Sequence, residues 1–153
     1  MANLKVEHIA GLAINGTVDL VESNPALTPT PINTIPTGNL SHIRCDQDFQ
    51  FDFNWNQIGW IGCILCGDYR IDVCFEQWNT GEFSPTPNSV IVPSQHGSNV
   101  NYKASINFLA GSVPPGVYGI VACITLLDKM GNPQPIAGFV DLGKVKFYDY
   151  KKC

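Results

Sequence analysis

Residues 63–66 read CILC and place two thiols at the C-x-x-C spacing of half a zinc site. Both sulfur atoms of such a site must approach one ion to about 2.3 Å. This requires a tight turn, because residues three apart on a strand face opposite sides. Gly59, Gly62 and Gly67 would permit that turn. A second C-x-x-C or H-x-x-H pair does not occur in the sequence, although closed tetrahedral sites normally use two ligand pairs.

Two hypotheses cover the cysteines of this chain. In the first, Cys63 and Cys66 bind a metal ion with ligands from neighbouring strands, for which Cys45, Cys74 and His42 are the candidates. In the second, the thiols are small apolar groups buried between strands, as is usual in a reducing compartment. We expect the second, and therefore no metal and no cofactor. The full set is Cys45, Cys63, Cys66, Cys74, Cys123 and Cys153.

The histidines are dispersed, at positions 8, 42 and 96. His96 lies near Ser94 and Ser98, but a hydrolytic triad needs a nucleophile and a base oriented by a third group. The G-x-S-x-G motif does not occur in the sequence. No set of residues with complementary catalytic roles can be named. We therefore expect that the protein is not an enzyme.

Two binding chemistries remain open. Trp60 and Trp78 lie near predicted turns, where they could stack on the rings of a carbohydrate or form an edge of the core. Carboxylates recur on the polar sides of two predicted strands, where they could coordinate calcium. The simpler interpretation is that they point outward and pair with Arg70 and lysines. These carboxylates are Asp46, Asp48, Asp52, Asp68, Asp72 and Glu76.

The elements that must position these residues are short strands. IRCDQDFQFDFNW, residues 43–55, is predicted to form a strand. Aromatic and polar side chains alternate strictly in its second part, DFQFDFNW, so the aromatic residues are predicted to face a core. DYRIDVCFE, residues 68–76, repeats this scheme with Cys74 on the polar side. Eleven prolines and fourteen glycines interrupt the sequence, and no long helical pattern occurs. These features are typical of an all-β domain.

Further strands are predicted at residues 17–22, around VIV at 90–92, at 100–108 and at 117–127, and a last strand or strand pair at 136–150. The segment at 117–127 is apolar on both faces, which predicts a central strand. Lys144 and Lys146 suit an edge strand. About seven strands at this spacing favour an antiparallel β-sandwich of seven to nine strands.

The stretch VPPGVYGIVACITLLDKMGNP, residues 113–133, resembles strand F of immunoglobulin-like and fibronectin-type domains. The resemblance covers about the last two-thirds of the chain and implies an immunoglobulin-like β-sandwich, with Tyr118 at the tyrosine corner. It also implies a core tryptophan, for which Trp55 and Trp60 are the candidates. It implies no function, because the fold is shared by many unrelated proteins.

The chain is predicted to form one domain over residues 1–153. Residues 1–23 form an N-terminal strand or arm, residues 24–40 a proline-rich connection, and residues 41–153 the body. A stiff, extended connection could carry the arm to another subunit. The alternative is an ordinary first strand that folds back on its own sheet. If the arm mediates assembly, deletion of residues 1–36 should leave a soluble monomer.

Charged residues make up only 14% of the chain, and the net charge is −4. The absence of a basic excess argues against nucleic acid as a partner. Without a recognisable signal peptide or membrane span, we expect a cytoplasmic protein, or one exported by another route. The function that we expect is a non-enzymatic structural or protein-interaction module that forms homo-oligomers through edge strands or the N-terminal arm. The alternative is a carbohydrate- or metal-binding module.

Overall fold

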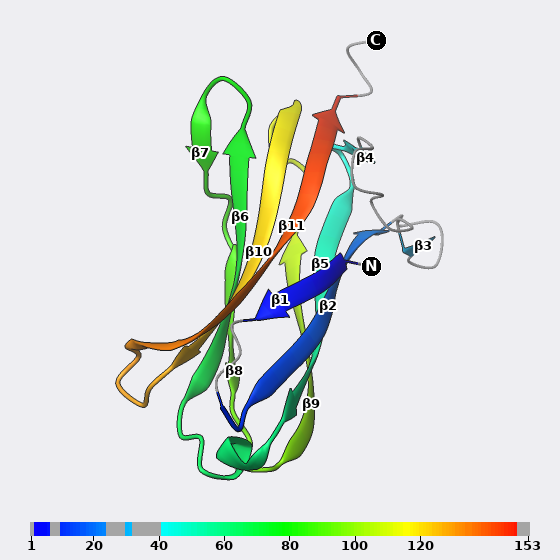
Figure 1. Ribbon diagram of the computed structural model, residues 1–153. Coiled ribbons are helices and arrows are strands. Elements are labelled where there is room, and N and C mark those ends of the chain that lie inside the picture. The colour runs from blue at the N-terminus through cyan, green and yellow to red at the C-terminus, as the bar shows by residue number, and fades with distance from the viewer. Residues whose placement is uncertain (1, 7–9, 24–29, 32–40, 150–153) are drawn as a thin grey trace.

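In the computed structural model, the described residues are 2–6, 10–23, 30–31 and 41–149. They form an all-β sandwich of two sheets (Figure 1). Sheet A contains β1 (Ala2–Val6), β2 (Ala13–Ser23), β5 (Asp48–Ile58) and β9 (Asn99–Phe108), with the two-residue β3 (Thr30–Pro31) beside β2. Sheet B contains β4 (Ser41–Arg44), β6 (Asp68–Gln77), β7 (Gly81–Phe83), β8 (Ser89–Pro93), β10 (Gly116–Leu127) and β11 (Pro133–Tyr148).

Sheet B is mixed, because β4 runs parallel to β11 while its other pairs are antiparallel. β1 joins the two sheets at one side of the sandwich: its first half pairs with β2 and its second half with β11. The helix η1 (Trp60–Cys63) follows β5. No helix in the described part of the chain is long and apolar enough to span a membrane.

The predicted aromatic face of β5 forms the centre of the core. Phe49, Phe51, Phe53 and Trp55 are all buried. The ring of Phe49 stacks on Phe108 at a centroid distance of 4.9 Å, and the ring of Trp55 stacks on Tyr102 at 5.1 Å. Alternation therefore predicted this strand and its buried face correctly. Trp55 is the core tryptophan of the two candidates, since Trp60 is 66% exposed.

Gly16 allows β2 to approach β5 closely at Trp55. The two residues lie directly opposite each other on β2 and β5. A Cβ atom at Gly16 would lie 2.9 Å from both the Asn54 carbonyl oxygen and the Trp55 Cβ. A larger residue at this position would therefore push the two strands apart.

The predicted edge position of the last strand is wrong. β11 pairs with β10 on one side and with β4 and β1 on the other, so it lies inside sheet B. Its lysines point outward from the face of the sheet, and the Lys144 Nζ lies 3.9 Å from the centre of the Trp78 ring. The predicted central position of β10 is confirmed, because β10 lies between β6 and β11.

The N-terminal segment folds back on its own chain. β2 pairs with β5 along eleven residues, from Ala13 opposite Ile58 to Ser23 opposite Asp48. Its side chains at Ile14, Val18 and Leu20 are buried in the core between the sheets, as is the preceding Leu12. Of the proline-rich connection at 24–40, only Thr30 and Pro31 are among the described residues, and they pair with the end of β2. The rest of that prediction lies outside the described residues.

Gln57 is a fully buried polar side chain at the end of β5. Its Oε1 accepts hydrogen bonds from the hydroxyls of Tyr69 at 2.7 Å and Tyr102 at 3.1 Å. Its Nε2 donates to the carbonyl oxygens of Gly62, Gln95 and Gly97 at 3.0–3.4 Å. This side chain therefore ties the η1 turn and the β8–β9 connection to the core.

Candidate functional site

The four cysteines considered as metal ligands lie in three separate parts of the molecule. Cys63 and Cys66 lie at the end of η1 and in the turn that follows it. Cys74 lies on the outer face of β6, opposite Val121 of β10. Cys45 follows β4, and its N–H donates to the Tyr148 carbonyl oxygen at the end of β11. Among residues 2–6, 10–23, 30–31 and 41–149, no group of three His, Cys, Asp or Glu residues is placed to hold a metal ion.

The expectation of buried thiols is wrong for three of the cysteines. Cys63, Cys66 and Cys74 are exposed, whereas Cys45 and Cys123 are half-buried. Cys153 lies outside the described residues. The error at Cys63 and Cys66 arises because a turn replaces the strand that would have buried one of them. Cys74 faces outward, as alternation predicted, and nothing in the described structure covers that face.

Cys74 of β6 and Cys123 of β10 are diagonal neighbours on the outer face of sheet B, since Cys74 lies opposite Val121 and Cys123 lies opposite Asp72. Burial, together with the neighbouring Cys74 and Asp72, raises the pKa of Cys123 to about 11. Partial desolvation of its sulfur atom and the nearby Asp72 also raise the pKa of Cys74. Both thiols therefore stay protonated at neutral pH, which disfavours them as nucleophiles and as metal ligands.

His96 and its neighbouring serines do not form a catalytic group. The His96 Nδ1 lies 3.1 Å from the Cys63 carbonyl oxygen, and the Ser94 hydroxyl donates to the Gly67 carbonyl oxygen at 2.8 Å. Ser98 is exposed, and its carbonyl oxygen accepts a hydrogen bond from the Gly59 N–H. His42 is exposed on β4, with its ring edge toward Tyr148. His8 lies outside the described residues.

The two tryptophans proposed for carbohydrate binding are both exposed, by 66% at Trp60 and 53% at Trp78. Trp60 precedes β6 and Trp78 follows it. A ten-residue strand is roughly 30 Å long, so the two indoles lie at opposite ends of the sandwich. They cannot form a single platform for one short glycan.

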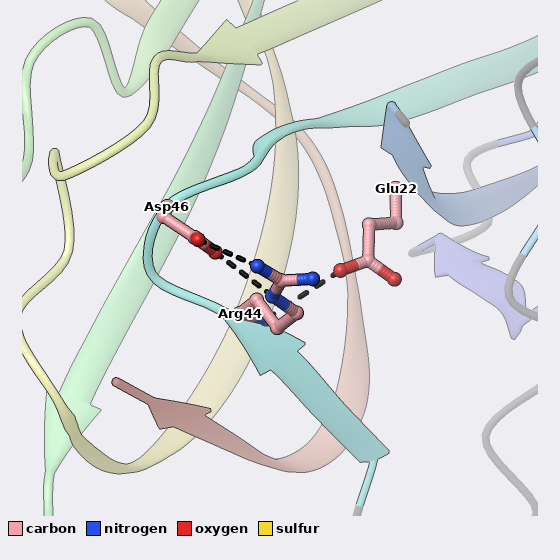
Figure 2. A network of polar contacts seen from close by, with 3 residues as sticks. All are labelled: Glu22, Arg44 and Asp46. Atoms are coloured by element: carbon pink, nitrogen blue, oxygen red, sulfur yellow. Dashed lines mark hydrogen bonds and ion pairs between the residues drawn. The ribbon is translucent and has the colours of Figure 1, made fainter. Parts of the chain in front are cut away.

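Several carboxylates already have protein partners. The Asp46 carboxylate accepts two hydrogen bonds from the Arg44 guanidinium at 2.6 and 2.9 Å (Figure 2). The backbone N–H of Arg44 donates to the Glu22 Oε1 at 3.5 Å. Asp72 accepts a hydrogen bond from Arg70 at 2.9 Å. These ion pairs agree with the simpler interpretation of outward, paired carboxylates. Asp48 accepts the Ala110 N–H at 2.7 Å.

The outer face of sheet A carries a ladder of neutral amides that sequence reasoning missed. It has a shallow depression of about 350 Å³ over β2, β5 and β9. The Asn56 Nδ2 donates to the Oδ1 atoms of Asn99 at 2.7 Å and Asn101 at 2.9 Å. The sequence shows the alternating polar residues of DFQFDFNW and VNYKASINF separately. Only the pairing of β5 with β9 shows that the two sets of polar side chains lie on one face of sheet A. The outward amides and hydroxyls of β2, β5 and β9 include Asn15, Thr17, Gln50, Asn54, Asn56, Asn99, Asn101, Ser105 and Asn107.

β9 forms an open edge of sheet A. It pairs with β5 in unbroken register from Asn99 opposite Ile58 to Phe108 opposite Phe49. No described strand pairs with its other side, and no other backbone hydrogen bond of the described residues involves residues 99–108. β9 contains no proline and no bulge, and Lys103 is its one charged residue. The edge of sheet B beside β6 is shorter: β7 has three residues, and β8 has five and ends at Pro93.

No protein-family model matches this sequence, and no curated protein matches it. Among solved structures, the chain is similar to the X-ray structure of a Northeast Structural Genomics Consortium target, SoR45. The match has 6% sequence identity and a TM-score of 0.28, and it covers 94% of this chain and 90% of that chain. A likeness of this kind identifies no family, so the function has to be argued from the geometry.

Proposed function

We propose that this protein is a non-enzymatic interaction module that assembles with a second copy of itself through the open edge of β9. The observation that carries the proposal is the long, regular and unpaired edge described above. Native proteins usually blunt such an edge with proline, bulges, charges or short strands, because its free N–H and C=O groups are a template for another strand. Of these features, β9 has only one, the charge of Lys103.

We also propose an immunoglobulin-like topology for the sandwich. The pairing β2–β5–β9 would correspond to strands A, B and E, and β6–β10–β11 to strands C, F and G. Two details support this assignment. The Tyr118 hydroxyl donates to the Pro114 carbonyl oxygen at 3.0 Å, which is the hydrogen bond of a tyrosine corner. β7 and β8 both pair with β6 in sheet B. No described strand therefore occupies the position beside β9 that strand D has in an immunoglobulin-like sheet.

Sedimentation velocity across a concentration series tests the assembly. The 16.7 kDa chain should sediment as a dimer. Substitution of both Asn101→Lys and Asn107→Lys places three positive charges along the outer side of β9, and the protein should become monomeric because like-charged edges repel. The matched control, Asn15→Lys with Thr17→Lys, adds the same charge to the same face on β2 and should stay dimeric. A wild-type monomer at every soluble concentration contradicts the proposal.

A second candidate function is carbohydrate binding at the amide-lined depression of sheet A. Asn15, Asn54 and Asn101 line it with groups that could bond sugar hydroxyls. Trp55 and Tyr102 also border the depression, but both are buried with their rings stacked in the core. Glycan-array binding that is lost on Asn54→Ala, with sedimentation unchanged, would favour this function over assembly.

A further inference from the structure

Cys63 and Cys66 are a pair of thiols that the proposed function does not use. Both side chains are exposed, and no other C-x-x-C spacing occurs in the sequence. An exposed pair at this spacing suits metal binding or redox exchange. In the part of the chain that the structure describes, no three His, Cys, Asp or Glu residues are placed to hold a metal ion. Redox exchange depends on whether the chain brings the two sulfur atoms together.

Two backbone hydrogen bonds hold the segment that carries these thiols. The Gly97 N–H donates to the Gly62 carbonyl oxygen at 3.0 Å, and the Ser94 N–H donates to the Gly67 carbonyl oxygen at 3.1 Å. The Ser94 hydroxyl donates to the same Gly67 oxygen at 2.8 Å. The two segments therefore run antiparallel, with five residue steps from Gly62 to Gly67 opposite three in the other segment. The longer segment must bulge outward between its two anchors.

Cys63 and Cys66 are the first and last residues of this bulge. The Ile61 carbonyl oxygen accepts the N–H groups of Ile64 and Leu65 at 2.9 and 3.1 Å, so the chain bends after η1. In an extended strand, the Cα atoms of residues three apart are separated by roughly 10 Å, whereas a disulfide needs about 4.4–6.8 Å. The bend shortens this separation. Leu65 is buried and fixes the bulge to the core, whereas Ile64 is 64% exposed, so the apex can tighten without loss of core packing.

A depression of about 310 Å³ beside Cys66 gives a small molecule access to the bulge. Ser94, His96 and Lys129 are among the residues that line it. The His96 Nδ1 also lies 3.1 Å from the Cys63 carbonyl oxygen. The same imidazole therefore borders both ends of the bulge.

We propose that Cys63 and Cys66 form a reversible disulfide by exchange with a small disulfide such as glutathione disulfide. One cysteine thiolate attacks a sulfur atom of glutathione disulfide, whose S–S bond breaks, and one glutathione leaves and takes up the proton of that cysteine. The second cysteine attacks the mixed disulfide, so the Cys63–Cys66 bond forms and the second glutathione leaves with the second proton. The two protein thiols lose two electrons, and glutathione disulfide gains them.

Cys74 and Cys123 are the internal reference for this reaction. They are diagonal neighbours on β6 and β10, and diagonal neighbours are about 7–8 Å apart, which exceeds the usual Cα separation of a disulfide. Their raised pKa values also keep them protonated at neutral pH. We therefore expect these two thiols to remain open to alkylation when Cys63 and Cys66 are oxidised.

Peptide mass mapping of the full-length protein tests the pair. Reduced protein is equilibrated in glutathione buffers, quenched with acid and alkylated with N-ethylmaleimide. Residues 45–70 form one tryptic peptide, because Arg70 is the first basic residue after Arg44. This peptide should lose two hydrogen atoms and carry one alkyl group, at Cys45.

The dependence on glutathione concentration separates a protein disulfide from a mixed disulfide. The ratio of linked to reduced protein follows [GSSG]/[GSH]², whereas a mixed disulfide follows [GSSG]/[GSH]. If both forms of glutathione are diluted about tenfold together, the wild-type ratio should therefore rise about tenfold. Cys63→Ser and Cys66→Ser should each form only a mixed disulfide at the remaining thiol, and its fraction should stay constant.

The anchor at Gly67 provides a second measurement. Ser94→Ala removes the hydroxyl that bonds the Gly67 carbonyl oxygen, which loosens one end of the bulge. The ratio of linked to reduced protein should fall about fivefold. Ser98→Ala is the matched control, because Ser98 is an exposed serine of the same connection and only its backbone carbonyl oxygen bonds Gly59. This variant should keep the wild-type ratio.

The outcomes are decisive for the pair. A mapped Cys63–Cys66 link, with the expected response to dilution, supports the proposal. Wild-type protein that accumulates mixed disulfides at Cys63 or Cys66 without this link overturns it, and so does a link from either residue to Cys45. Equal ratios in Ser94→Ala and Ser98→Ala overturn the role of the anchor. None of these measurements depends on the dimer, so failure here and failure of the proposed assembly are distinguishable.

Discussion

At the residue scale, the side chain with the greatest structural effect is Gln57. An amide can accept and donate at once, and Gln57 uses both capacities inside the core. Two tyrosine hydroxyls and three carbonyl oxygens form hydrogen bonds with this one side chain. Nothing in its sequence context distinguishes it, because by alternation it continues the buried face that carries the aromatic residues.

Gln57→Leu should therefore destabilise the protein by about 2–4 kcal/mol, although leucine is more hydrophobic and similar in size. The substitution leaves the Tyr69 hydroxyl without its acceptor in a buried site and removes the donor from the Gly62 and Gly97 carbonyl oxygens, whereas the Tyr102 hydroxyl keeps the Gln95 carbonyl oxygen at 3.3 Å. Each unsatisfied buried group costs about 1–3 kcal/mol. Urea unfolding followed by tryptophan fluorescence measures the change. Gln95→Leu, which alters only an exposed side chain of the neighbouring loop, should be nearly neutral. Equal stability of the two variants would show that the network contributes little.

The thiols should also differ in reactivity. The raised pKa of Cys123, about 11 against an ordinary 9.0, leaves about one-hundredth of the usual thiolate at pH 8. Iodoacetamide should modify the exposed Cys63 and Cys66 long before Cys123, as peptide mass spectrometry can follow. The rate at Cys123 should keep rising with pH up to about pH 11. A rate at Cys123 that levels off near pH 9 would show that burial does not raise the pKa of this thiol.

At the element scale, the residues that form strands can be predicted more easily than the strands that lie beside one another. β5, β6 and β9 follow from alternation within their own residues, whereas the position of β11 depends on which strands come to lie beside it. The prediction of one strand over residues 43–55 is wrong at its start, because β4 ends at Arg44 and pairs with β11 in sheet B, whereas β5 begins at Asp48 in sheet A. Lys144 and Lys146 of β11 mark the outward face of sheet B and not its edge.

Gly16 allows a direct test of the contact between β2 and β5. Gly16→Ala should cost about 1–3 kcal/mol in the free energy of unfolding, because its Cβ would overlap the Asn54 carbonyl and the Trp55 Cβ. Gly119→Ala on β10 is the matched control. A Cβ there has its nearest neighbour at 3.9 Å, so this substitution should be neutral or slightly stabilising. Chemical denaturation of both variants gives the comparison, and a neutral Gly16→Ala would mean that the strands separate without cost.

At the scale of the whole molecule, the N-terminal segment belongs to the sandwich. β1 links the sheets and β2 separates β1 from β5, so these strands bury apolar residues and complete the hydrogen bonding of sheet A. An arm that serves only assembly could be removed without loss of the fold. The segment from Ala13 to Ser23 does not fit that description.

Deletion of residues 1–23 should therefore abolish cooperative unfolding and give an aggregating protein rather than a soluble monomer. The deletion would expose the other edge of β5 and leave Phe51, Phe53 and Trp55 partly uncovered. Circular dichroism with thermal unfolding checks this result. Addition of a synthetic peptide of residues 1–23 should restore part of the cooperative signal. A soluble, folded monomer after deletion would reinstate the segment as an exchangeable arm.

The sequence by itself determined the class of the fold, the strands that alternate and the residues that form the aromatic core. These properties depend on the periodicity of neighbouring residues, which any single sequence displays. Only the tertiary structure decided that Cys63 and Cys66 are exposed, that Trp60 and Trp78 lie at opposite ends of β6, and that β9 has an open side. These facts depend on which distant segments become neighbours. A periodic pattern specifies the face of a strand but carries no information about what lies beside it.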